Sequence, residues 1–452
     1  MNELPFRFDS IPWRRVIPWL HLTRAFWIAV DLRKLVLAAT GLLLISAGSL
    51  VCDQLPFGQG GRGESAFHKG EEARWPWEWS LGFQVQGGID DFPARSTLSE
   101  FRGILEHPGQ TVFCALGNWQ IVLHPVRAIA DPAIRLFRGQ STRADIADAV
   151  TRLLWALMVW SVFGGAIARI AAVQFARDQQ IGIRRALGFA LRRFFGYLSA
   201  PLLPLAGVAV LWFLCVIAGW LGRIPEPVGD TLVGILWGVE LILGLMMAVV
   251  LLGLAIGWPL MFATIGVEGT DGFDGLSRMY NYVYERPLYY LWQIGLVLVY
   301  GSGAIFFVSL MAQMLVYLAV WGVSWGGDFP GTINRIADSP TIVVEGVMRT
   351  VTDPQTTEPS ETVGAKLAQG WMSALATLVM GFVYSFFWTA ATIVYFTLRR
   401  SVDANDFDEV YLDEEQEADE LLPLVGLAAT GPQPAPSAEP QPTPPPVVDL
   451  MP

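Results

Sequence analysis

Six long apolar runs constrain this chain more than any other feature. Each run holds at least about 17 residues, which is enough for a helix to cross the hydrocarbon core of a bilayer. Only 16% of the 452 residues are charged, whereas soluble domains average about 25%, and the mean hydropathy is +0.43. The sequence therefore predicts an all-α integral membrane protein and excludes a soluble enzyme, a disordered protein and a disulfide scaffold.

The apolar runs divide the chain into a simple order of segments. We expect a cytoplasmic interfacial segment, a first span, an extracytoplasmic loop, two helical hairpins, a second extracytoplasmic loop, a last span and a cytoplasmic tail. In that order these are residues 1–34, 35–51, 52–149, 150–221, 231–321, 322–370, 371–398 and 399–452. Each hairpin supplies two spans, so about six transmembrane helices are expected.

Basic residues on the flanks of the spans orient the chain. Residues 1–34 hold six Lys and Arg, residues 176–197 hold five Arg, and the last span ends in Arg399 and Arg400. These three regions fall on one side of a six-span map, and positive flanks mark the cytoplasmic side of a membrane. The pattern therefore predicts that both termini are cytoplasmic.

The middle of the chain contains two similar units. Residues 164–167 (GGAI) resemble residues 253–256 (GLAI), and residues 193–198 (RFFGYL) resemble residues 286–291 (RPLYYL). The offsets are 89 and 93 residues, so one insertion of four residues reconciles them. Both units run in the same direction, which predicts a parallel repeat of two helical hairpins. The alternative is that two unrelated hairpins converged on a similar composition.

Each unit turns through an amphipathic stretch. The apolar positions of the first stretch share one helix face: Ile183, Leu187, Ala190, Phe194 and Leu198. Four arginines lie off that face: Arg184, Arg185, Arg192 and Arg193. Such a helix lies flat at the level of the headgroups, so we expect anionic headgroups of membrane lipids as partners of these arginines. A simple topological anchor is the alternative.

Glu240 is the one acidic residue inside an apolar run. An ionisable group within a span is costly and marks a functional site by default. Counted from residue 231, Glu240 lies about 13 Å along the helix, and Arg152 and Gln313 are its candidate partners from other spans. A proton or cation site is one interpretation, and a carboxyl group that locks helix packing is the other.

The chain has three cysteines and four histidines. Cys215 lies inside a span, whereas Cys52 and Cys114 share the first extracytoplasmic loop, where a disulfide can form. The histidines are not spaced as metal ligands, and no P-loop, dinucleotide fingerprint or H-E-x-x-H motif is present. We therefore expect no metal, no cofactor and no catalytic residue, and nothing indicates nucleic-acid binding.

The net charge of −11 belongs to the tail. Residues 403–420 carry ten carboxylates and no Lys or Arg, and residues 421–452 contain ten prolines. A proline-rich chain is extended and disordered. The acidic segment also contains four apolar residues that form a candidate docking peptide for a protein partner: Phe407, Val410, Tyr411 and Leu412. A purely solubilising tail is the alternative.

Four stretches of the sequence carry a resemblance to a known group. They are residues 272–278 (GFDGLSR), 282–287 (YVYERP), 395–404 (YFTLRRSVDA) and 407–412 (FDEVYL). Together with the spans, they resemble multi-pass inner-membrane proteins of planctomycete-type bacteria, a group with no assigned activity. The resemblance covers mainly residues 150–415. It implies a location in a bacterial inner membrane and adds no catalytic residue.

Two functions fit these features. The first is a non-enzymatic membrane protein that acts as a scaffold or accessory subunit, with a protein partner in the membrane or the cytoplasm. This hypothesis rests on the small number of polar residues inside the spans and on the docking features outside them. The second is a transporter or lipid-handling protein in which Glu240 faces a cavity between the two units.

Overall fold

The computed structural model of this chain describes residues 18–56, 75–76, 109, 112, 115–116, 119–137, 142–225, 227–326 and 363–412. Helices account for 89% of these residues, and no strand occurs among them. The expectations for residues 1–17, for Cys114, for most of both extracytoplasmic loops and for the tail after Leu412 lie outside the described residues.

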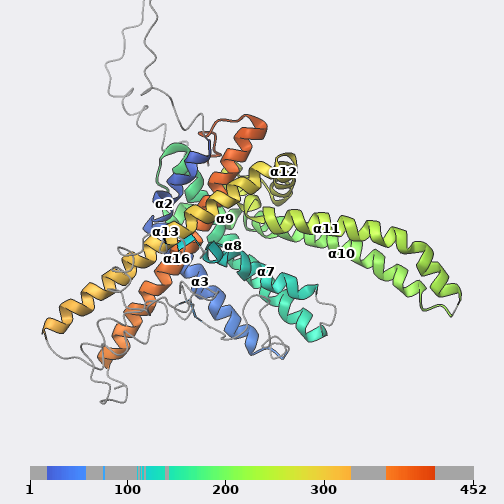
Figure 1. Cartoon of the computed structure of the whole chain (residues 1–452), viewed down its shortest axis with the longest axis horizontal. Coiled ribbons are helices and arrows are strands. Elements are labelled where there is room, and N and C mark those ends of the chain that lie inside the picture. Colours follow the sequence, from blue (N-terminus) through green and yellow to red (C-terminus); the bar gives the residue numbers. More distant parts are fainter. Residues whose placement is uncertain are drawn as a thin grey trace, which may run out of the picture. The chain divides into compact units, whose positions relative to one another are not determined.

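Twelve helical elements follow one another in the described part of the chain (Figure 1). They are η2 (Pro18–Thr23), α2 (Arg24–Ala29), α3 (Leu32–Asp53), α6 (Trp119–Val122), α7 (His124–Leu136), α8 (Arg143–Arg177), α9 (Ile183–Arg192), α10 (Phe194–Leu221), α11 (Val228–Glu268), α12 (Gly272–Glu285), α13 (Pro287–Gly326) and α16 (Val363–Asp403). Within these residues, α3, α8, α10, α11, α13 and α16 are long and apolar enough to cross a membrane. Each contains one predicted span, so the prediction of an all-α, multi-pass membrane protein is confirmed.

Local capping sets the ends of the long helices. Thr142 and Asp145 form a capping box at the start of α8, in which Asp145 N donates to Thr142 Oγ1 at 3.2 Å. Asp178 directly follows α8, the first helix of the first unit, and Gly269 directly follows α11, the first helix of the second unit. Both residues have a left-handed backbone, with φ of 56° and 65°, which stops the helix. Pro259 lies inside α11, which remains one continuous helix.

Helices α8 and α16 form the centre of the body. Their most apolar windows are 83% and 89% buried, whereas those of α10 and α11 are 11% buried. Trp160 of α8 stacks on Tyr384 of α16 with 4.7 Å between ring centroids. Trp388 of α16 lies 4.8 Å from Phe262 of α11. Aromatic rings therefore fill the space where these three helices meet.

Helices α10 and α11 run side by side as a hairpin (Figure 1). Nearly all of their buried residues lie in the halves next to α9 and α12, and their other halves expose large apolar side chains. Helix α11 also contains two pairs of glycines spaced four residues apart, and the surroundings of the two pairs differ. A Cβ at Gly253 or Gly257 would meet α12, whereas Gly234 and Gly238 have nothing within 4 Å. Within the described chain, only Gly253 and Gly257 allow a neighbouring helix to pack closely.

The two units share their architecture as well as their sequence. In each, a long helix (α8 or α11) is followed by a shorter amphipathic helix (α9 or α12) and then by a second long helix (α10 or α13). At the same offset of 93 residues, four pairs of equivalent residues are buried: Ala186 and Met279, Phe189 and Tyr282, Ala190 and Val283, and Tyr197 and Tyr290. The predicted parallel order of two helical hairpins is present.

The described part of the segment between α3 and α8 packs on the bundle. Helix α7 buries Pro125, Ile129 and Pro132. The Nδ1 atom of His124 lies 3.0 Å from the hydroxyl oxygen of Tyr384 on α16. These contacts make α7 part of the folded body.

Gly165 of α8 allows the close approach of α10. A Cβ at this position would lie 2.8 Å from the ring of Tyr197, which is fully buried. We predict that Gly165→Ala lowers the free energy of unfolding by about 1–3 kcal/mol, the usual cost of overpacking. Gly238→Ala is the matched control, because both variants gain the same helix propensity but nothing lies within 4 Å of Gly238. Thermal unfolding in detergent gives the comparison, and equal stability of the two variants would contradict the prediction.

Candidate functional site

The described chain gathers its basic flanks at one end of the helices. We call this region the basic end; it comprises residues 18–34, 174–193, 268–286 and 399–410. Contacts join all four segments. Arg24 pairs with Asp178, and Arg193 donates to the carbonyl oxygen of Thr270 at 3.4 Å. The Nε atom of Arg399 lies 3.4 Å from Glu268 Oε1. The three basic regions that the sequence assigns to one side of the membrane therefore lie together.

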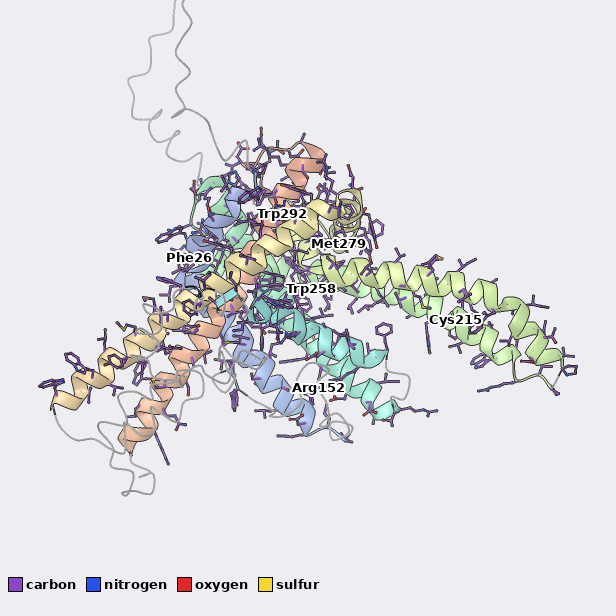
Figure 2. All side chains as sticks on the ribbon, viewed as in Figure 1. Phe26, Arg152, Cys215, Trp258, Met279 and Trp292 are labelled. Carbon is purple, nitrogen blue, oxygen red and sulfur yellow. The ribbon has the colours of Figure 1, made fainter. Side chains whose placement is uncertain are left out.

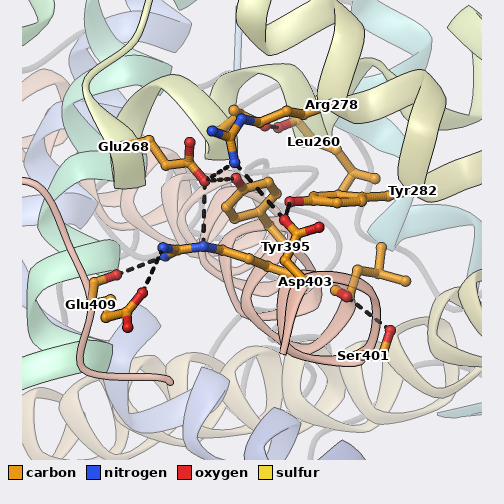
Figure 3. A network of polar contacts seen from close by, with 11 residues as sticks. Leu260, Glu268, Arg278, Tyr282, Tyr395, Ser401, Asp403 and Glu409 are labelled. Atoms are coloured by element: carbon orange, nitrogen blue, oxygen red, sulfur yellow. Dashed lines mark hydrogen bonds and ion pairs between the residues drawn. The ribbon is translucent and has the colours of Figure 1, made fainter. Parts of the chain in front are cut away.

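A network of seven side chains occupies the basic end (Figure 3). We call it the Glu268 network, and its members are Glu268, Arg278, Tyr282, Tyr395, Arg399, Asp403 and Glu409. They come from the end of α11, from α12, from the last turns of α16 and from the segment that follows α16.

Glu268, the last residue of α11, is the centre of this network. Its Oε1 atom accepts a hydrogen bond from Arg278 at 2.8 Å and another from the hydroxyl of Tyr395. The Nε atom of Arg399 lies 3.4 Å from the same oxygen. The side chains of Glu268 and Arg399 are only 10% and 9% exposed, so their charges interact with little screening by water.

Asp403 and Glu409 extend the network to the end of α16. Tyr282 donates a hydrogen bond to Asp403, and Arg278 lies 3.9 Å from the same carboxylate. Arg399 donates to the carbonyl oxygen of Glu409 at 2.7 Å and to its carboxylate at 3.1 Å. The segment after α16 is thereby folded back onto the helix that precedes it.

Phe407 fixes the same segment from the apolar side. Its ring lies 4.6 Å from that of His21, 5.8 Å from that of Phe175 and 4.5 Å from the guanidinium of Arg400. Val410 is half-buried against the same core. Phe407 and Val410 therefore anchor the start of the tail to the body.

The docking peptide expected at Phe407, Val410, Tyr411 and Leu412 is thus divided. The first two side chains are engaged by the body, which makes them unsuitable for binding a separate partner. Tyr411 is exposed and Leu412 is half-buried. Both belong to a second unit, Tyr411–Pro452, of which only these two residues are described.

The sequence indicated most of the network residues as parts of the resemblance to a known group, and not as members of a site. Six of its seven residues lie in the four stretches that carry the family resemblance, and the structure brings those stretches together. Glu268 was missed. The available signal was a carboxylate at the end of an apolar run, directly before the Gly269 helix stop and ten residues before Arg278.

The four expected headgroup arginines have different surroundings. Arg184, Arg185 and Arg192 are exposed on α9. Arg193 is half-buried, with its guanidinium 5.2 Å from the ring of Phe189 and bonded to the backbone of Thr270. The apolar face of α9 packs against the protein through Ala186, Phe189 and Ala190. The arginine-bearing face of α9 is therefore the one that is exposed.

Glu240, Arg152 and Gln313 do not form one site. Glu240 is half-buried on the hairpin and lies near the thiol of Cys215 on α10. Gln313 is half-buried on α13. Arg152 of α8 donates to Asp148 at 2.9 Å and to Asp53 at 2.6 Å. Figure 2 shows Arg152 and Cys215 on their separate elements. The expected pairing of Glu240 with Arg152 is wrong, because Arg152 is used to join α8 to the end of α3.

The predicted disulfide stays a prediction. Cys52 is buried near the end of α3, and its proposed partner Cys114 lies outside the described residues. Among the described residues, no three His, Cys, Asp or Glu side chains are grouped so that they could hold a metal ion.

Comparison with protein-family models, with curated proteins and with solved structures finds no match.

Glu268→Gln tests the centre of the network. We predict that the loss of one charge from this nearly buried group lowers the free energy of unfolding by about 2–3 kcal/mol, because Arg278 and Arg399 lose the carboxylate that they share. Asp230→Asn is the matched control, since Asp230 is an exposed carboxylate near the other end of α11. Thermal unfolding measures both variants, and an equal loss in the two would contradict a central role for Glu268.

Tyr282 gives the network a dependence on pH. Burial raises the pKa of Tyr282 from an ordinary value of 10 to about 12, and the hydrogen bond to Asp403 acts in the same direction. Because the folded pKa is the higher one, this contribution to stability is complete below pH 10 and is lost as the pH rises toward 12. We predict that stability falls more steeply between pH 10 and 12 in the wild type than in Tyr282→Phe. Parallel slopes in chemical unfolding at graded pH would contradict this.

Proposed function

We propose that this protein is a non-enzymatic scaffold or accessory subunit of a membrane complex. In this proposal the folded body holds a fixed exit point from which the acidic, proline-rich tail extends toward a protein partner. The observation that carries the proposal is the Glu268 network, because it joins the second helical unit, α16 and the start of the tail at one place.

The placement of the charges supports this role. Residues 413–420 carry six carboxylates and no Lys or Arg, and they follow directly after the anchored segment. Of the four carboxylates before that point, Asp403 and Glu409 are bonded within the body, whereas Asp406 and Asp408 are exposed. Most of the acidity offered to a partner therefore lies after Leu412. Attachment at a rigid point restricts where such a peptide can reach and raises its local concentration near the membrane.

The proposed location is a bacterial inner membrane with both termini in the cytoplasm. The six apolar helices support a multi-pass protein, and the basic end supports the orientation through the positive-inside rule. The resemblance to inner-membrane proteins of planctomycete-type bacteria supports the type of membrane.

The surroundings of Glu240 favour this proposal over a transporter. A coupling carboxylate would be expected to face a polar path. Glu240 lies instead near Cys215 of α10, and its neighbours on α11, Val239 and Leu241, are exposed apolar side chains. Where α8, α11 and α16 meet, the side chains are Trp160, Phe262 and Trp388.

Deletion of residues 413–452 tests the proposal, because it keeps the Glu268 network intact. We predict that the wild type leaves native membranes with a stoichiometric protein partner after gentle solubilisation, and that the deletion variant leaves without it. Native mass spectrometry measures the composition of the particles. Deletion of residues 421–452 alone is the control that retains the acidic segment and should keep the partner. A wild type recovered only as a monomer or homo-oligomer would contradict the proposal.

A further inference from the structure

Each unit has a corner where its amphipathic helix (α9 or α12) meets the long helix that follows it (α10 or α13). We call residues 183–198 the first corner and residues 276–291 the second corner. At the shared offset of 93 residues, both corners expose apolar side chains at the same positions. Leu191 and Tyr284 are 59% and 46% exposed, and Phe195 and Leu288 are 79% and 81% exposed. The repeat therefore presents the same outward shape twice.

The charges of the two corners differ. Arg184, Arg185 and Arg192 are exposed on the first corner, and α9 contains no acidic residue. The equivalent residues of the second corner are Ser277, Arg278 and Glu285. Arg278 is paired with Glu268 at 2.8 Å, and Glu285 is exposed. The second corner also exposes Arg286, directly beside Glu285. One surface shape thus carries three exposed arginines in the first unit, and one exposed arginine beside an exposed glutamate in the second.

A second apolar side chain lies beside the first corner. Gly196 and Gly272 approach closely, since a Cβ at Gly196 would lie 3.4 Å from the backbone nitrogen of Gly272. The residues next to these glycines, Phe195 and Phe273, are both exposed. Arg193 is folded inward onto Phe189 and Thr270. The outward surface therefore combines exposed phenylalanines with Arg184, Arg185 and Arg192.

We propose that the first corner binds the headgroup of an anionic phospholipid and that the second corner does not. The corner is where a membrane-spanning helix begins, so its phenylalanines lie at the level of the acyl chains and its arginines at the level of the phosphates. Each basic side chain near an anionic surface strengthens binding, which gives the charge complementarity. The proposal goes beyond the scaffold role, since it does not require a protein partner.

The test uses the purified full-length protein in a non-ionic detergent. Phosphatidylglycerol or phosphatidylcholine is added, and native mass spectrometry measures retained lipid. The wild type is expected to retain phosphatidylglycerol in preference to phosphatidylcholine. Arg184→Gln with Arg192→Gln is expected to weaken retention about fivefold for each arginine removed. Ser277→Gln with Glu285→Gln is the matched control at the equivalent positions and should leave the retention unchanged.

A gain-of-function variant keeps the test informative if the first variant is poorly folded. Ser277→Arg with Glu285→Arg transfers the charge to the second corner and is expected to add a second bound phosphatidylglycerol. Equal retention of the two lipids by the wild type would overturn the proposal, as would unchanged retention in the Arg184→Gln, Arg192→Gln variant. Binding that appears only after deletion of residues 413–452 would also overturn it, in favour of the chain's own acidic segment as the occupant.

Discussion

The nearly buried carboxylate of Glu268 is the interaction on which the basic end depends. A charge at the end of a long apolar helix requires partners, because little water reaches it. Arg278 supplies one from α12, and Tyr395 and Arg399 supply two from α16. These bonds determine how the second unit turns and where α16 stops. Arg399 then holds Glu409, so the same carboxylate indirectly fixes the start of the tail.

The features that could be predicted from the sequence are local ones. The six spans follow from continuous apolar runs, and the two amphipathic helices follow from the spacing of their apolar residues. The repeated units were recognisable because two short motifs recur in the same order, at offsets of 89 and 93 residues. Each of these patterns is recognised from the residues of a single segment, so no knowledge of neighbouring helices is needed.

Contacts between helices were not predictable in the same way. Arg152 and Gln313 were candidate partners of Glu240 because all three lie within spans, but residue position along a span does not define which helices are neighbours. Cys215 is the actual neighbour because α10 and α11 are joined by a short turn. The Glu268 network needs residues up to 141 positions apart. No periodic pattern records such a distance, and only the clustering of unusual motifs indicated where to look.

The length of α11 has a consequence for the membrane itself. Its 41 residues span about 60 Å at 1.5 Å per residue, roughly twice the hydrocarbon thickness of a bilayer. Apart from Glu240, its residues from 231 to 267 are uncharged, so much of this length favours an apolar environment. The helix must therefore tilt, extend beyond the hydrocarbon core or thicken the bilayer around it, and each response has a cost that changes with bilayer thickness. Hydrophobic mismatch thus makes the energy of this chain depend on the lipid composition of the membrane that holds it.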